Sequence, residues 1–229
     1  MIEIIPAVDV ASGRVVQSGG DPFEVCFDWQ ARGAARLHLV DLDVAFGRGD
    51  NRELLAEVVG RLDVPVQLSG GIATPERVQL ALDAGADRVV IGTQAVADRD
   101  WLSAELANLP TTLAVALDVR GDRLAPRGTD LELGPWREAL VWLNAAGCRR
   151  YVVTSIGGSG LELLREVREF TDAKLIASGG VASLDDVAAV EGIAEAAIVG
   201  AALYSGALSF EEAIGITSPS RSATPNDDS

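Results

Sequence analysis

An internal repeat constrains the fold of this chain more than any other feature of its sequence. Residues 66–73 (VQLSGGIA) match residues 175–182 (LIASGGVA), so that Ser69 and Ser178 are separated by 109 positions (178 − 69 = 109). Nearly the same offset relates residues 7–10 to 116–119, residues 53–55 to 162–164, and residues 90–93 to 198–201. Several matches at one spacing indicate two copies of a single structural unit.

Within each copy, short apolar runs alternate with longer segments of helical pattern. Strands are expected at residues 3–8, 36–40, 64–68, 88–91, 113–117, 150–154, 174–177 and 196–199. Helix starts are indicated by Thr74 followed by Pro75, and by Ser183 with Asp186 three positions later. The pattern predicts an α/β fold, a single (β/α)8 TIM barrel made of two homologous half-barrels.

The barrel is expected to occupy residues 1–216, a span typical of this fold. Residues 217–229 are rich in Ser, Pro, Asp and Asn and are predicted to form a disordered tail. Cys26 and Cys148 fit no metal-ligand spacing and are interpreted as free thiols.

Charge and hydropathy narrow the classes of partner. The formal net charge of −15 opposes binding to nucleic acid, which requires basic surfaces. No apolar run reaches the roughly 18–20 residues of a membrane span, and the N-terminus lacks a signal-peptide pattern. We therefore expect a cytoplasmic monomer whose partner is a small molecule, with no nucleic acid and no membrane.

The repeat predicts two phosphate-binding sites at the carboxyl ends of the strands, where active sites of such barrels lie. The first comprises Ser69, Gly70, Gly71, Gly92 and Thr93, and the second comprises Ser178, Gly179, Gly180, Gly200 and Ala201. Glycines let backbone N–H groups approach phosphate oxygens, and a following helix favours an anion. One Gly-Gly turn can serve tight turn geometry alone. Two paired turns favour a bisphosphorylated substrate that spans the barrel mouth.

A matching pair of acidic residues suggests the chemistry. Asp9 and Asp118 stand at the ends of strands that face each other across the barrel, where they are expected to act as general base and general acid. A single acid at a strand end often only caps a helix, whereas a symmetric pair favours catalysis. Neither a metal cluster nor a nucleotide loop or nucleophile triad is visible. The expected reaction is therefore isomerisation by proton transfer without a cofactor.

Three further polar residues lie within or just after the second predicted strand and are not assigned a catalytic role. His38, the only histidine of the chain, lies inside the second strand and is interpreted as structural, with a barrel-lining role as the alternative. Of Asp41 and Asp43, one is expected to line the mouth and the other to cap a helix.

Several motifs resemble those of a known family. They are residues 5–9 (IPAVD), 37–43 (LHLVDLD), 46–47, 49–51, 68–72 (LSGGI) and 117–121 (LDVRG). Up to about Ala213 the chain resembles the histidine-biosynthesis phosphoribosylformimino-aminoimidazole carboxamide ribotide isomerase family, and within it the dual-substrate phosphoribosyl isomerase A branch.

The resemblance implies an Amadori-type aldose–ketose isomerisation of that histidine intermediate. In the dual-substrate branch it also implies isomerisation of phosphoribosylanthranilate in tryptophan biosynthesis. Asp9 is then the base that removes the C2 proton, and Asp118 assists as acid or orients the substrate.

The sequence departs from the family pattern at four places on the catalytic face. The loop 11–21 is shortened, with Gln17 near the usual position of a substrate-gripping arginine, and the loop 123–133 lacks a Gly-Trp element. Ser155 follows Thr154 where the branch usually has an acid, and residues 157–160 lack a Lys-Asp-Gly-Thr stretch. Thr154 and Ser155 remain candidate substrate contacts.

These departures leave three hypotheses open. The first is the isomerase, and the second is a catalytically impaired paralogue that binds a phosphorylated ligand. The third is the related cyclase of the same pathway, which ranks last because residues 5–9 and 39–47 look more like the isomerase.

Overall fold

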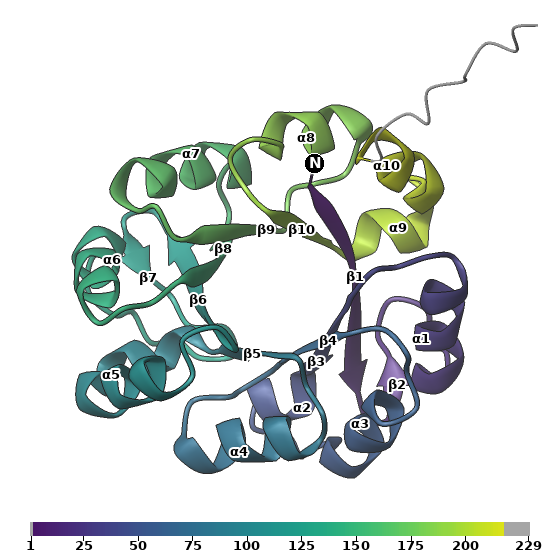
Figure 1. The fold of residues 1–229 in the computed structure, drawn as a ribbon, viewed down its shortest axis with the longest axis horizontal. Helices are drawn as coiled ribbons and strands as arrows, with labels where there is room; N and C mark the ends of the chain where they lie inside the picture. The colour runs from purple at the N-terminus through teal and green to yellow at the C-terminus, as the bar shows by residue number, and fades with distance from the viewer. Residues whose placement is uncertain (1, 218–229) are drawn as a thin grey trace, which may run out of the picture.

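The computed structural model describes residues 2–217 and shows a closed ring of parallel strands surrounded by helices (Figure 1). The parallel strands, in order around the ring, are β1 (Glu3–Ala11), β3 (Leu37–Asp41), β4 (Val66–Ser69), β5 (Arg88–Ile91), β6 (Leu113–Arg120), β8 (Arg150–Ser155), β9 (Lys174–Ser178) and β10 (Ala196–Val199). Pairing of β10 with β1 closes the ring. The predicted (β/α)8 barrel is thus confirmed.

The helices form the outer layer. They are α1 (Pro22–Ala31), α2 (Leu42–Ala45), α3 (Arg52–Val59), α4 (Pro75–Asp83), α5 (Arg99–Asn108), α6 (Trp136–Ala145), α7 (Gly160–Phe170), α8 (Leu184–Val190), α9 (Ala201–Ser205) and α10 (Phe210–Thr217). Thr74 caps α4, and Ser183 with Asp186 forms the predicted capping box of α8. Helix α10 extends to Thr217, and the rest of the predicted tail lies outside the described residues.

Two strands continue three residues further than the sequence pattern indicated. The expected strands ended at Val8 and Leu117, whereas β1 runs to Ala11 and β6 to Arg120. Each continues because it turns back into a short antiparallel strand, β2 (Arg14–Val15) after β1 and β7 (Arg123–Leu124) after β6. The two hairpins stand at equivalent positions in the repeat.

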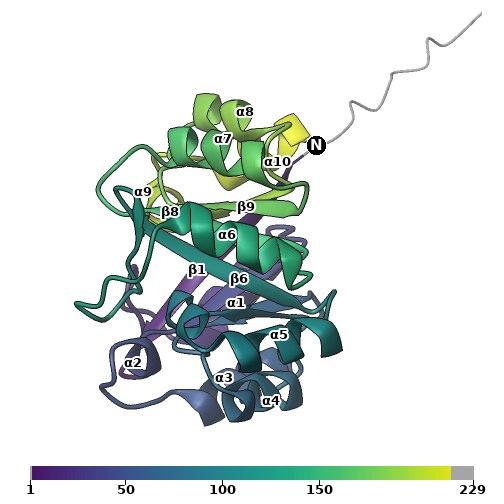
Figure 2. The ribbon, with the colours of Figure 1, turned by 90° about the vertical axis from the view of Figure 1, so that its left-hand side faces the viewer.

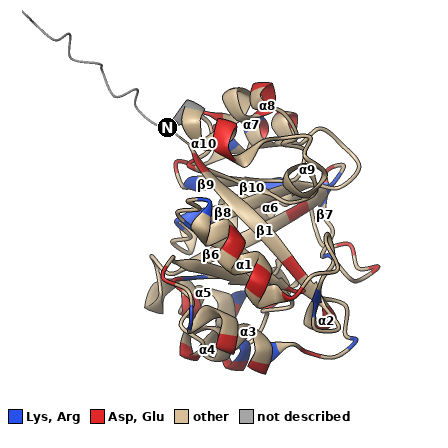
Figure 3. Cartoon of the chain, turned by 90° about the vertical axis from the view of Figure 1, so that its right-hand side faces the viewer, with Lys and Arg blue, Asp and Glu red and all other residues tan. Residues whose placement is uncertain are grey.

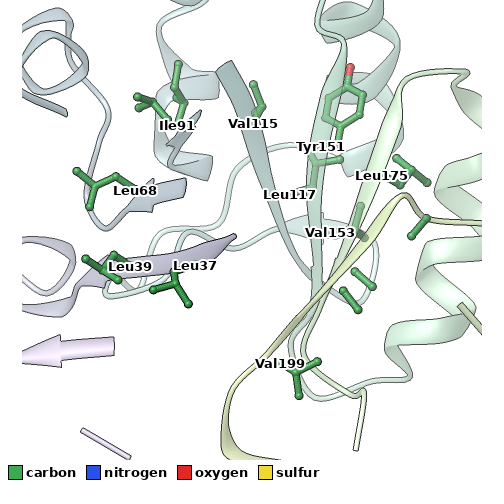
Figure 4. Packing of buried hydrophobic residues seen from close by; sticks show 14 of the residues in the cluster. Leu37, Leu39, Leu68, Ile91, Val115, Leu117, Tyr151, Val153, Leu175 and Val199 are labelled. Atoms are coloured by element: carbon green, nitrogen blue, oxygen red, sulfur yellow. The ribbon is translucent and has the colours of Figure 1, made fainter. Parts of the chain in front are cut away.

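The hydrophobic core lies in two layers on either side of the barrel wall. Alternate residues of each strand point outward and pack under the helices, as Leu39, Val115 and Leu175 do in Figure 4. A smaller cluster fills the barrel interior and comprises Ile5, Ala7, Val90, Ala114, Val152, Ile176, Ala196 and Ile198. These side chains form an apolar plug below the mouth, so the cavity above it has a water-excluding floor.

Charged residues are distributed over the outer helices and the loops. In Figure 3 acidic residues are spread over α1, α3 and α4. No helix within residues 2–217 is long and apolar enough to cross a membrane. Figure 2 shows the barrel from the side, with α2 and α9 toward the same end. These helices follow β3 and β10 directly, and that end carries the site described next.

Candidate active site

A cavity of about 440 Å³ opens at the carboxyl ends of the parallel strands. Its lining includes the two aspartates, Asp9 and Asp118, and all residues predicted to bind phosphate, namely Ser69, Gly70, Gly71, Gly92, Thr93, Ser178, Gly179, Gly180, Gly200 and Ala201. Strands β1 and β6, which carry the aspartates, are separated by three strands in either direction around the ring. The structure therefore brings the predicted site together, with its two aspartates on opposite walls.

Asp118 is buried and has three polar neighbours. The Thr93 hydroxyl lies 2.7 Å from the Asp118 carboxylate and 2.9 Å from the Ala116 carbonyl oxygen, and it accepts from the Asp118 backbone N–H at 3.0 Å. The Arg127 guanidinium forms an ion pair with the carboxylate at 3.1 Å. Burial raises the pKa of Asp118, and Arg127, Thr93 and Thr154 partly offset that rise.

The Thr93 hydroxyl can serve both protonation states of Asp118. A hydroxyl has one hydrogen and two lone pairs. It can donate to the carboxylate, or it can accept from the carboxylic acid while donating to the Ala116 oxygen. Asp118 can therefore gain or lose a proton without losing its hydrogen-bond partner.

Asp9 has a different neighbour. The Gln17 side-chain amide donates to the Asp9 carboxylate at 2.5 Å. Burial raises the pKa of Asp9, and the Gln17 hydrogen bond and the Arg127 charge partly offset that rise. Position 201, the counterpart of Thr93 in the repeat, is alanine and provides no hydroxyl. An amide N–H can only donate, so this hydrogen bond favours the carboxylate of Asp9, against the burial that raises its pKa.

The two hairpins explain how Gln17 and Arg127 reach the aspartates. The N–H of Val16 donates to the Asp9 carbonyl oxygen, and the N–H of Ala125 donates to the Asp118 carbonyl oxygen, both at 2.8 Å. Each returning strand is thus pinned beside its aspartate. The loops 11–21 and 123–133 therefore each deliver one polar side chain to the pair of aspartates.

The glycine turns have the backbone conformations that only glycine adopts readily. Gly70, Gly71, Gly179 and Gly180 all have positive φ angles, between +62° and +107°. The first turn is also tightly packed, because a Cβ added at Gly70 would lie 2.3 Å from the Asp41 carbonyl oxygen. A Cβ at Gly179 would meet nothing closer than 3.9 Å.

The helix predicted after the first phosphate turn is a 3-10 helix. Gly92 is its N-cap and it spans Thr93–Ala97, whereas the α-helix α5 begins only at Arg99. The buried Thr93 hydroxyl is already engaged, because it is bonded to Asp118 and Ala116. Only the backbone of Gly92 and Thr93 is therefore available to an anion.

Other predicted residues are distributed around the site. Thr154 lines the cavity, whereas Ser155 ends β8 and is not part of the lining. Neither Asp41 nor Asp43 lines the cavity, so the expectation that one of them lines the mouth is wrong, whereas the expected helix cap is observed. Asp41 caps α2 and holds Asn51, and Asp43 accepts from the Ser12 N–H of the first hairpin.

His38 lines the cavity and is also buried in the barrel wall, so the barrel-lining alternative is the one observed. Three contacts were not predicted from the sequence. Gln67 is the hydrogen-bond partner of His38, Arg88 donates to Gln67, and Arg127 forms the ion pair with Asp118. Gln67 and Arg88 stand at inward-facing positions of apolar strands, which was a usable signal. Among residues 2–217, no group of three or more His, Cys, Asp and Glu side chains could hold a metal ion.

Comparison with known proteins agrees with this geometry. The model of the family described as histidine biosynthesis protein matches residues 3–209. The chain belongs to this family. An isomerase from Acidothermus cellulolyticus is 48% identical over 93% of this chain and 97% of its own length. One from Thermobifida fusca is 47% identical over 93% and 96%.

Both relatives are named 1-(5-phosphoribosyl)-5-((5-phosphoribosylamino)methylideneamino) imidazole-4-carboxamide isomerase. A protein from Streptomyces avermitilis, 45% identical over 93% of this chain and 96% of its own length, is named phosphoribosyl isomerase A. The family expected from the motifs is therefore confirmed, and the expected class of enzyme, an isomerase, is the one these relatives' names state.

Proposed function

We propose that this chain is an aldose–ketose isomerase of histidine biosynthesis that acts on the substrate in its relatives' name. Such a substrate carries two phosphoribosyl groups, one at each end. The observation that carries the proposal is the placement of Asp9 and Asp118 on opposite walls of one cavity that also contains both Ser-Gly-Gly turns.

The environments of the two aspartates support different roles. Opening the aminoaldose ring needs a proton on the ring oxygen, which lets the C1–O bond break and an iminium form at C1. Asp118 can deliver that proton because the Thr93 hydroxyl can hydrogen-bond to both the carboxylic acid and the carboxylate form of Asp118. A base must then remove the C2 proton to give the enolamine. Asp9, whose carboxylate accepts from the Gln17 amide, is suited to that step.

The final tautomerisation restores the starting protonation states of both aspartates. C1 gains a proton, and the C2 hydroxyl loses one to become the ketone. Asp9 and Asp118 can exchange these protons in the reverse sense, so no net proton is consumed and no cofactor enters the scheme. The apolar plug below the cavity limits water access from inside the barrel, which strengthens the electrostatic interactions of both carboxyls.

Arg127 supports a link between substrate binding and the state of Asp118. The guanidinium side chain is 57% exposed and belongs to a surface loop, so its pair with Asp118 is weak, at about 0–1 kcal/mol. A phosphate entering the mouth competes for the same cation. When Arg127 turns to the phosphate, the pKa of Asp118 rises, which favours the protonated acid needed for ring opening.

The test is turnover of the purified chain with the bisphosphorylated aminoaldose and, separately, with phosphoribosylanthranilate. Conversion of the first supports the proposal. We include the second reaction in the proposal because one relative is named phosphoribosyl isomerase A. Its absence, with the first reaction present, would restrict the chain to histidine biosynthesis.

A second candidate function is phosphorylated-ligand binding without catalysis. Its support is Ser155, which stands after Thr154 where the resembling branch has an acid and does not reach the cavity. Folded protein that binds a bisphosphorylated ligand and turns over neither substrate would establish this alternative and refute the isomerase.

A further inference from the structure

A row of three polar side chains runs across three adjacent strands on the inner side of the barrel, beside the active-site cavity. The three residues lie on the adjacent strands β3, β4 and β5. His38 is the register partner of Gln67, and Gln67 is the register partner of Arg88. The Gln67 amide nitrogen lies 2.8 Å from His38 Nδ1, and Arg88 donates to the Gln67 Oε1 at 2.9 Å. All three residues are buried, Gln67 completely.

The chemistry of Arg88 fixes the direction of both hydrogen bonds. A guanidinium has donors and no acceptor, so it must face the oxygen of the Gln67 amide. The amide NH2 then faces His38, where Nδ1 has to accept. A neutral imidazole with an acceptor at Nδ1 carries its proton at Nε2. Because Gln67 occupies Nδ1, the nitrogen left to face the cavity is Nε2.

The surroundings also keep the ring uncharged. Burial, then the charges of Arg127 and Arg88, lower the pKa of His38 to about 3. Arg88 itself stays cationic at neutral pH, since burial and its arginine neighbours lower its pKa only to about 10. Glu195 lies 4.0 Å from Arg88, and its negative charge partly offsets this lowering of the pKa of Arg88.

We propose that Gln67 and Arg88 are positioning residues that hold His38 as its neutral Nε2–H tautomer, so that the ring presents a hydrogen-bond donor to a substrate oxygen in the cavity. The catalytic part of this inference rests on the proposed isomerase function. A neutral imidazole N–H stabilises negative charge developing on an oxygen without surrendering its proton. It therefore complements two aspartates that do exchange protons.

The tautomer can be read directly, because His38 is the only histidine of the chain. In protein labelled with 15N-histidine, Nδ1 is expected at the position of an unprotonated ring nitrogen and Nε2 at that of a protonated one. Neither resonance should titrate between pH 5.5 and pH 8.5, because the pKa lies near 3. A proton on Nδ1, or titration near the ordinary histidine value, would overturn the proposal.

The variant Gln67→Glu tests the relay itself. A carboxylate at this position can only accept, so Nδ1 must carry a proton, and above the pKa of the ring, which the carboxylate raises, the neutral tautomer is inverted. Turnover is then expected to fall about 100-fold, the typical effect of losing one donor to a developing oxyanion. Affinity for inorganic phosphate should stay within a few-fold. The matched control is Arg88→Lys, which still donates to the Gln67 oxygen and should keep the wild-type tautomer.

These readouts separate the proposal from the proposed function. Inversion of the tautomer with unchanged turnover would refute a catalytic role for the Nε2–H donor. If Gln67→Glu does not fold, the wild-type spectrum still decides the tautomer. A wild type that shows the Nε2–H tautomer but turns over neither substrate would refute the isomerase and, with it, the role of the donor in catalysis. The tautomer itself is measured without substrate.

Discussion

The two glycine turns offer a matched pair of substitutions, because Gly70 and Gly179 are equivalent in the repeat but differ in what surrounds them. Both have positive φ, +107° and +77°. At Gly70 a Cβ would lie 2.3 Å from the Asp41 carbonyl oxygen and 2.6 Å from its nitrogen, all rigid backbone at the end of β3. At Gly179 the nearest atom is a Thr154 methyl at 3.9 Å.

The expected losses follow from these distances. Alanine in the left-handed region costs about 1–2 kcal/mol at either site. At Gly70 the overlap with backbone adds about 1–3 kcal/mol, the usual cost of overpacking. The reduced entropy of the unfolded chain is the same in both variants and cancels from the comparison. Gly179→Ala should therefore lose about 1–2 kcal/mol and Gly70→Ala about 2–5 kcal/mol, by adding the two costs.

Urea unfolding of both variants measures this difference, and thermal unfolding provides a second reading. For a chain of this size, 1 kcal/mol corresponds to a shift in Tm of about 2–4 °C, so Gly70→Ala should melt about 2–12 °C below Gly179→Ala. Equal losses, or a larger loss for Gly179→Ala, would refute the claim that the first turn is packed against β3 more tightly than the second turn is packed against its neighbours.

Three further predictions concern single side chains. Thr93→Val keeps the shape but leaves the Asp118 N–H without its acceptor, so the free energy of unfolding in urea should fall by about 1–3 kcal/mol; an unchanged midpoint would contradict this role. Arg127→Gln removes a cation that lowers the pKa of Asp9 and Asp118. The acidic limb of the pH profile of kcat/KM, where the base becomes protonated, should therefore move to higher pH. A limb that stays in place or moves to lower pH would be inconsistent with the ion pair. Ser183→Ala breaks the capping box of α8 and should cost about 1 kcal/mol by urea unfolding, with catalysis unaffected.

The sequence predicted the scaffold because repeated patterns specify it. The 109-residue repeat and the alternating apolar runs indicated two half-barrels, and the structure closes them as expected. Asp9 and Asp118 were identified because symmetry places them at equivalent strands. These features depend on local pattern and on barrel topology, both of which can be read from one chain.

The partners of Asp9 and Asp118 were harder to predict, because they depend on geometry that no local pattern encodes. Gln17 and Arg127 reach the aspartates only because hairpins pin the returning strands beside them. The role of Thr93 depends on where its hydroxyl points. His38 and Gln67 meet only because β3 and β4 pair in one particular register, which their separate sequences do not reveal.

The most direct test of the proposed isomerase is the turnover of Asp9→Asn and Asp118→Asn beside Asp98→Asn, a control at the exposed cap of α5 where asparagine also caps well. Both active-site variants are expected to remain folded, to bind a bisphosphorylated ligand within a few-fold of wild type, and to lose about 100- to 10,000-fold in kcat, while the control keeps its activity. Near-wild-type kcat in either active-site variant would contradict the assignment of that aspartate to proton transfer.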